Sequence, residues 1–350
     1  MPDHNNKLFE LICSQIAESG PMPIESYWDI CLSHPQYGYY KRQDPLGQAG
    51  DFITAPEISQ MFGEMIGIWC ACAWSAWGRP EKIYLAECGP GRGTLMADLL
   101  RGIQHIEGFA RAVRVHLIET SPALRVKQKE ALAWADPFWH DDFEHLPQDA
   151  PVLFIGNEFL DALPIRQFVK GKENWQERLV GLNDHGVLQF VMGDKVLFER
   201  EGVEGSIAEV SPARQAVMEE IYERILHQKG AALMIDYGYA ASANGDTFQA
   251  VRKHGYAPVL ESQGEVDLTS HVDFGVLADA AQKRGLSVLL SDQGDFLRAM
   301  GIEIRTAALL QQANEDQKKS IASGLARLTG EAQMGRLFKV LEVAHEQTHS

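Results

Sequence analysis

The segment KIYLAECGPGRGTLMADLLRGI, residues 82–103, decides the fold of this chain. It begins with a short apolar run, turns through GPGRG at 89–93, and continues in a helical pattern. Short apolar runs bounded by turn residues indicate buried strands. Similar runs recur as RVHLIET (114–120), PVLFIGNEF (151–159) and AALMIDYGY (231–239), with helical segments between them. This alternation predicts an α/β fold with a mostly parallel sheet and right-handed crossovers.

Two segments interrupt the alternation. Residues 167–193 contain two alternating stretches joined by Asn183–Gly186, which predicts a hairpin, and residues 240–269 look irregular. Before the core, Pro56 fits the first turn of a helix that continues through the apolar stretch Met65–Trp77. We therefore expect a helical N-terminal region with one long loop over residues 1–80, and a core over residues 81–350 with insertions at about 167–228 and 240–270.

Composition and charge exclude several classes of protein. The formal net charge of −16 argues against nucleic-acid binding, which requires a basic stripe. It suits a basic protein partner, with a merely solubilising surface as the alternative. The five cysteines form no CxxC pair, and the scattered histidines predict no metal site. Because the first residues resemble no signal or transit peptide and the apolar stretch is too short to span a membrane, we expect a cytoplasmic protein without a membrane span.

The glycine turn has the features of a ligand-binding site. Glycines lack the Cβ atoms that would keep a ligand away from the backbone. A dinucleotide site prefers G-x-G-x-x-G, whereas this turn has G-x-G-x-G with an acid two residues before its first glycine. That acid would repel a pyrophosphate but suits the ammonium group of a cofactor's amino-acid tail; a purely structural turn is the alternative. The candidate cofactor-binding residues here are Glu87, Gly89, Pro90, Gly91, Gly93 and Thr94.

Acids also follow the next two strands. Glu119, followed by Thr120, closes the second strand, where a carboxylate can accept hydrogen bonds from both hydroxyls of a ribose. Asp142 and Phe143 follow the weakly marked third strand, where a carboxylate can bind an adenine amino group and the next N–H can meet the ring. Each acid alone is more typical of a solvated charge. Three acids in the order tail, ribose and adenine predict S-adenosyl-L-methionine as the cofactor.

The chain resembles the MidA family of class I methyltransferases along essentially its whole length. The matching stretches are GDFITAPEISQMFGE (50–64), AECGPGRGTLMADLLR (86–101), HLIETSPALRVKQ (116–128), GNEFLDALPIRQF (156–168), MIDYGY (234–239) and DLTSHVDF (267–274). The resemblance implies a Rossmann-like core with a seven-stranded sheet and insertions. It also implies a protein substrate, which in mitochondrial members is an arginine of a respiratory complex I subunit. The sequence itself does not decide the methyl acceptor or the oligomeric state.

Candidate catalytic residues follow the fourth strand. Asn157 occupies the place of a polar residue that orients the acceptor, and Glu158 and Asp161 share a face if the turn there is helical. Paired carboxylates match the fork of a guanidinium group, so we expect Glu158 and Asp161 to bind or deprotonate the acceptor nitrogen. The alternative is that both acids cap a helix and bind the preceding loop.

Two further segments are expected near the site. The loop Gly50–Glu57, with Ser59 and Gln60, is expected to fold over the core as a lid. From it Thr54, Glu57 and Gln60 could reach the cofactor tail or the acceptor, although helix capping by Thr54 is an equally good explanation. His271 is a candidate base in the acceptor channel, with a capping or core histidine as the alternative.

The sequence leaves four candidate functions. The first is a protein arginine methyltransferase linked to complex I assembly, and the second is a methyltransferase of another protein or a small molecule. The third is a cofactor-binding assembly factor with little turnover. The fourth, a nicotinamide-dependent oxidoreductase, is disfavoured by the glycine spacing.

Overall fold

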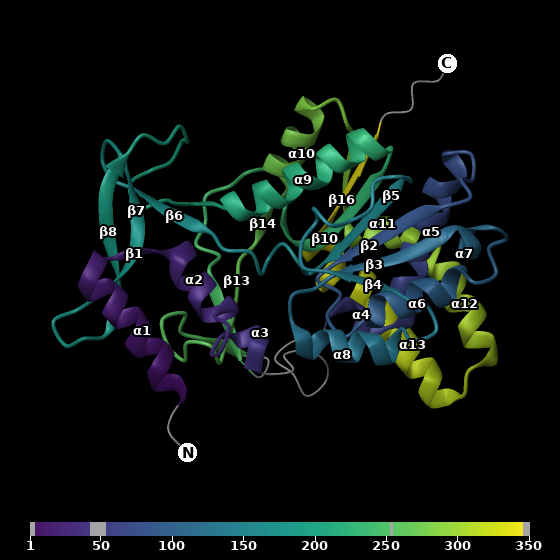
Figure 1. The fold of residues 1–350 in the computed structure, drawn as a ribbon, viewed down its shortest axis with the longest axis horizontal. Helices are drawn as coiled ribbons and strands as arrows, with labels where there is room; N and C mark the ends of the chain where they lie inside the picture. Colours follow the sequence, from purple (N-terminus) through teal and green to yellow (C-terminus); the bar gives the residue numbers. More distant parts are fainter. Residues whose placement is uncertain (1–3, 43–53, 253–254, 346–350) are drawn as a thin grey trace.

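The computed structural model describes residues 4–42, 54–252 and 255–345. Its largest sheet has the order β15-β16-β10-β5-β2-β3-β4, with the short β14 paired to β10 (Figure 1). The eight strands are β2 (Ile83–Cys88), β3 (Val113–Ile118), β4 (Phe138–His140), β5 (Val152–Asn157), β10 (Ala231–Tyr239), β14 (Val272–Asp273), β15 (Ser287–Asp292) and β16 (Phe338–Ala344). Only β16 pairs antiparallel, with β10 and β15, so the predicted α/β class with a mostly parallel sheet is confirmed. The sheet has eight strands instead of the expected seven, because the short β14 was not predicted.

Helices cover both faces of this main sheet. The helices of the described chain, of which α1–α3 lie away from the main sheet, are α1 (His4–Ser19), α2 (Ile24–Ser33), α3 (Tyr39–Arg42), α4 (Ala55–Ile58), α5 (Gln60–Ala76), α6 (Thr94–Ile103), α7 (Phe109–Ala112), α8 (Pro122–Ala131), α9 (Pro212–Gln228), α10 (Phe274–Lys283), α11 (Gln293–Ala299), α12 (Ile302–Gln312), α13 (Glu315–Thr329) and α14 (Met334–Leu337). Along β10, Leu233 and Ile235 pack with α5 and α6, whereas Ala232 and Met234 pack with α9 and α10. Burial on both faces explains why the central strands are continuous apolar runs.

Two smaller sheets lie beside the main one, on the left of Figure 1. The first contains β1 (Met22–Pro23), β6 (Arg166–Lys170), β7 (Trp175–Leu182), β8 (Leu188–Val196) and β9 (Ile207–Val210). Strands β7 and β8 form the predicted hairpin, closed between Leu182 and Leu188. The second contains β11 (Gln249–Arg252), β12 (Gly255–Ala257) and β13 (Asp267–Thr269), so the expectation of an irregular segment over 240–269 is wrong.

The N-terminal region packs against these insertions. Helices α1 and α2 share a buried apolar cluster with Val180 of β7 and Leu268 of β13, and β1 pairs with β7. The region is therefore not purely helical. The helix expected from Pro56 through Trp77 is broken, because Ser59 adopts an extended conformation and its hydroxyl accepts the Met61 N–H. The turn α4 is thereby separated from α5. Helix α9 lies within the predicted insertion 167–228 but packs on the main sheet. The predicted boundaries of the two regions, 1–80 and 81–350, stay a prediction.

None of the described helices is long and apolar enough to cross a membrane. All five cysteines are free thiols.

Candidate functional site

A pocket lies at the carboxyl ends of β2 and β5, where ligands bind in open α/β sheets. Its volume, including the space at its open mouth, is about 430 Å³. We call it the β2–β5 pocket, and the described residues that line it are Thr54, Pro56, Glu57, Glu87, Gly89, Pro90, Gly91, Arg92, Thr94, Leu95, Asn157 and Glu158. Residues predicted separately from the glycine turn, the fourth strand and the N-terminal loop are therefore brought together. Gly50–Ile53 of the expected lid lie outside the described residues.

The glycine turn requires glycine at its first position. Gly89 has a φ of +63°, and a Cβ atom there would lie 2.9 Å from Cδ2 of Phe159. Gly91 and Gly93 also have positive φ values, of +53° and +82°, and Gly93 directly precedes α6. The turn thus exposes bare backbone beside the first N–H groups of a helix, an arrangement that favours bound polar groups.

Glu87 is a buried carboxylate without a complete set of partners. Its side chain ends β2, the residue is 3% exposed, and Oε2 has no hydrogen-bond partner among the described residues. Burial raises the pKa of Glu87 to about 8. A cation in the pocket would supply the missing partner, because a buried charge is stable only when it is paired. The ammonium group of an amino-acid tail fits this position.

Glu119 is connected to the glycine turn through one glutamine. Its Oε1 accepts the Ser121 N–H at 2.6 Å, and its Oε2 accepts Nε2 of Gln128 at 3.1 Å. The same Nε2 donates to the Gly91 carbonyl at 2.8 Å. Gln128 therefore fixes the spacing between the acid after β3 and the turn after β2. Thr120, in contrast, is exposed.

The third predicted acid lies farther out. Asp142 is half-exposed and forms a 2.7 Å ion pair with His145, which lowers the pKa of the Asp142 carboxyl. Phe143 is buried against Phe154, and its carbonyl accepts a hydrogen bond from Arg224. Neither residue is among the described residues that line the β2–β5 pocket.

The end of β5 carries a strained acid. Glu158 has a φ of +49°, and its N–H donates to the Ile235 carbonyl at 2.9 Å. Its Oε1 accepts Nδ2 of Asn157 at 3.1 Å and the N–H of Ala55 at 3.0 Å. Burial raises the pKa of Glu158 to about 7, although the Ala55 N–H opposes this. Oδ1 of Asn157 is buried and has no partner among the described residues. Both side chains therefore retain unused acceptor capacity at the pocket.

Asp161 does not line the β2–β5 pocket with Asn157 and Glu158, but is buried behind them. Its Oδ2 accepts the Tyr237 hydroxyl at 2.6 Å, and its N–H donates to Oδ2 of Asp236 at 3.0 Å. Burial raises the pKa of both aspartates, and the neighbouring Asp161 charge raises that of Asp236 further. The left-handed conformation of Glu158 explains why a helical spacing did not bring Asp161 into the pocket.

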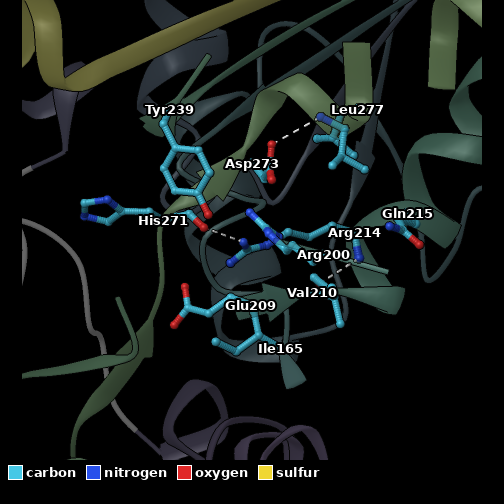
Figure 2. Close-up of a pocket in the computed structure, with 12 residues that line it drawn as sticks. Ile165, Arg200, Glu209, Val210, Arg214, Gln215, Tyr239, His271, Asp273 and Leu277 are labelled. Carbon is cyan, nitrogen blue, oxygen red and sulfur yellow. Dashed lines mark hydrogen bonds between the residues drawn. The ribbon is translucent and has the colours of Figure 1, made fainter. Parts of the chain in front are cut away.

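A second pocket, of about 440 Å³, surrounds Arg214 (Figure 2). The Arg214 guanidinium is buried and donates to the carbonyls of Leu160, Asp161, Leu163, Ser270 and His271 and to the Ser270 hydroxyl. Figure 2 shows the His271 ring pointing away from Arg214, while the His271 carbonyl faces it. The ring packs edge-on against Tyr237, and burial lowers the pKa of the His271 imidazole. His271 therefore lines this second pocket and is not among the described residues that line the β2–β5 pocket.

Sequence reasoning did not identify three of these contacts. Gln128 and Arg214 come from helices distant in the sequence, and nothing in their local pattern marks them. Glu57 was expected to reach the cofactor tail or the acceptor, but its contact with the core was not expected: its Oε1 accepts the Thr94 hydroxyl at 2.7 Å. Within the part of the chain that the structure describes, no group of three or more His, Cys, Asp or Glu residues is arranged to hold a metal ion.

Comparison with known proteins identifies the family. Residues 65–291 match the S-adenosyl-L-methionine-dependent methyltransferases. The chain belongs to this family. It is 33% identical over 371 residues to the mitochondrial protein arginine methyltransferase NDUFAF7 of Xenopus tropicalis, covering 97% of this chain and 86% of that protein. It is 34% identical to the Caenorhabditis elegans homolog of that protein, with the same two coverages.

A solved structure supports the same assignment. A COG1565 superfamily member from Burkholderia thailandensis, crystallised with S-adenosyl-homocysteine, is 26% identical to this chain with a TM-score of 0.84. The match covers 98% of this chain and 92% of that one. The resemblance to the MidA family and the S-adenosyl-L-methionine cofactor are confirmed. The unpartnered Glu87 oxygen and the bare glycine turn fit that cofactor.

The expected cytoplasmic location is corrected by these comparisons. The Xenopus, nematode and Drosophila relatives are all named as mitochondrial proteins, which contradicts that expectation. The expectation rested on the first residues alone, and they carry too little information about location.

Proposed function

We propose that this methyltransferase methylates an arginine side chain of a protein. The observation that carries the proposal is a cluster of three carboxylates: the half-buried Glu158 lines the β2–β5 pocket after β5, and the buried Asp161 and Asp236 lie behind it. Glu158 and Asp161 each raise the pKa of at least one other member. The buried Arg214 guanidinium opposes this at Asp161 and Asp236, but the pKa of both aspartates is still raised. A guanidinium group would relieve this repulsion, and it can form two hydrogen bonds with one carboxylate. The relatives named protein arginine methyltransferase support the same acceptor.

In this proposal the cofactor lies along the ends of β2 and β3. Glu87 binds its ammonium group, Glu119 its ribose hydroxyls, and the backbone from Gly89 to Thr94 its amino-acid tail. Thr54 lines the same pocket and contacts the cofactor from the N-terminal side. Asp142 and Phe143 are assigned to the adenine because they follow β4. Their position outside the β2–β5 pocket requires the adenine to extend along the sheet edge.

The residues at the end of β5 act on the acceptor. When bound, S-adenosyl-L-methionine supplies a methyl group on a sulfonium, an activated carbon that needs alignment more than further activation. Asn157 accepts a hydrogen bond from the acceptor nitrogen through Oδ1 and so orients it. As the nitrogen–carbon bond forms and the sulfur–carbon bond breaks, Glu158 takes the proton that the guanidinium loses. Asp161 and His271 position this turn through Tyr237 and Arg214.

A labelling experiment tests the acceptor. The protein is incubated with methyl-labelled S-adenosyl-L-methionine and extract from cells lacking it, and labelled residues are identified by mass spectrometry. We expect methylarginine on one protein; methylation of another residue type or of a small molecule would overturn the proposal. A complex I subunit is the partner that the family resemblance suggests, and the identity of the labelled protein decides it.

The role of Glu158 has a separate test. Glu158→Gln should lower turnover at least about 100-fold, the usual contribution of a proton-transfer group. It should lower S-adenosylhomocysteine affinity far less, because glutamine can still accept the Ala55 N–H. Turnover of the native protein should rise as the pH increases through about 7, where Glu158 ionises. The matched control is Glu81→Gln, because Glu81 is exposed. Normal turnover in Glu158→Gln would remove the residue from the mechanism.

We also propose that residues 81–350, with their insertions, act as the cofactor-binding core, completed by the turn α4 from residues 1–80. A nucleic-acid acceptor remains disfavoured by the net charge of −16.

A further inference from the structure

One wall of the β2–β5 pocket comes from residues that precede the segment 65–291, the part of the chain that matches the family model. Thr54, Pro56 and Glu57 line the pocket from α4, whereas the family match begins at residue 65. The extended Ser59 separates this turn from α5, so its position is not imposed by that long helix. The contacts that α4 makes with the core must therefore determine where it lies.

Two side-chain contacts hold α4 across the pocket. At its start, the Ala55 N–H donates to Oε1 of Glu158 at the end of β5, at 3.0 Å. At the third residue of α4, Oε1 of Glu57 accepts a hydrogen bond from the Thr94 hydroxyl, at 2.7 Å; Thr94 is the first residue of α6. The Glu57 N–H also donates to the Thr54 carbonyl, at 2.9 Å, which keeps the turn closed. The Glu57 carboxylate is thus half-buried and held in one orientation over the amino end of α6.

Glu57 and Glu87 line the same pocket, one on the N-terminal turn and the other at the end of β2. An ammonium group has three N–H donors, and one carboxylate at the back of a pocket does not satisfy all three. We propose that Glu57 is a second ligand of the cofactor's ammonium group, opposite Glu87, so that α4 is a cofactor-binding element. The inference rests on the proposed placement of the amino-acid tail against Glu87. Thr94 positions Glu57 and has no need to touch the ammonium group itself.

The test compares two ligands that differ only in the tail. S-adenosylhomocysteine has the amino-acid tail, and 5′-methylthioadenosine has the same nucleoside and sulfur without it. Calorimetry measures the affinity of both for the native protein, for Glu57→Gln, and for the exposed control Glu81→Gln. Loss of a hydrogen bond between charged groups should lower the S-adenosylhomocysteine affinity of Glu57→Gln about tenfold or more. The 5′-methylthioadenosine affinity should stay within about twofold, and Glu81→Gln should change neither.

Each other outcome overturns the inference. Equal losses for both ligands would show that Glu57 only shapes the pocket, and an unchanged S-adenosylhomocysteine affinity would show that Glu57 does not bind the tail. Thr94→Val is a second variant that leaves the carboxylate in place but unanchored; it should lose part of the tail-dependent affinity and retain the native melting temperature. All these measurements are made without a methyl acceptor, so they do not depend on whether the acceptor is arginine.

Discussion

Replacing Glu87 by glutamine should stabilise the cofactor-free protein and weaken its binding of the cofactor. Burial raises the pKa of Glu87 from 4.5 to about 8, so the folded protein keeps this proton at neutral pH whereas the unfolded chain has lost it. A group that binds its proton more tightly in the folded state contributes full stability below its unfolded pKa and loses it as the pH rises. Between pH 4.5 and 7 each pH unit costs about 1.4 kcal/mol, and the loss reaches about 3 kcal/mol.

Glutamine stays neutral and avoids this loss. Glu87→Gln should therefore raise the free energy of unfolding by up to about 3 kcal/mol at pH 7 and change it little near pH 4.5. Urea denaturation at both pH values measures this difference. A variant that is less stable than the native protein at pH 7 would refute the assignment of Glu87 as a buried, proton-holding carboxyl.

The same proton should make cofactor binding depend on pH. Pairing with an ammonium group requires the ionised carboxylate, of which about 1% is present at pH 6 and about half at pH 8. The S-adenosylhomocysteine affinity of the native protein should accordingly rise about fiftyfold over this range, and calorimetry in two buffers should detect release of one proton. Glu87→Gln should bind weakly and independently of pH. An equally steep pH dependence in the variant would mean that another group carries it.

Two substitutions test the framework of the site by urea denaturation. Gly89→Ala places a Cβ atom 2.9 Å from Phe159 at a residue with positive φ, and should lower the free energy of unfolding by about 2 kcal/mol or more. The control Gly20→Ala also has positive φ but meets open space, and should lower it by only about 1 kcal/mol. Equal losses in the two variants would contradict the clash. In Arg214→Lys the ammonium group cannot replace the guanidinium hydrogen bonds around the turn after β5, so the free energy of unfolding should fall by about 3 kcal/mol. The exposed Arg111→Lys is the control. A loss below about 1 kcal/mol in Arg214→Lys would show that these bonds contribute little.

The core strands could be predicted because they are buried on both faces and therefore have continuous apolar sequences. Strands β2, β3, β5 and β10 lie in the middle of the main sheet, and each was located within a residue or two. The small sheet β11–β13 was missed for the opposite reason. Its strands have three or four residues, and Tyr256 in β12 is 84% exposed, so no apolar alternation marks them. Ala250, Val251 and Leu268 of this sheet are buried, but strands of three or four residues are too short for a period of two to be recognised.

The site could be predicted where it follows from strand order. Glu87 and Asn157 end adjacent parallel strands, so their proximity follows once the sheet is known. Asp161 was misplaced because its position depends on the backbone conformation of Glu158, which a spacing rule cannot supply. Glu57, Gln128 and Arg214 act through contacts between segments far apart in the chain. Such contacts are created by tertiary packing and leave no local pattern.

On the proposed assignments, Glu158 links the two halves of the reaction. Its carboxylate holds the Ala55 N–H of α4 and also receives the proton of the acceptor. A hydrogen bond to an ionised carboxylate is stronger than one to a neutral carboxyl. The turn α4 is therefore held most tightly when Glu158 is ionised, which is the state required before methyl transfer.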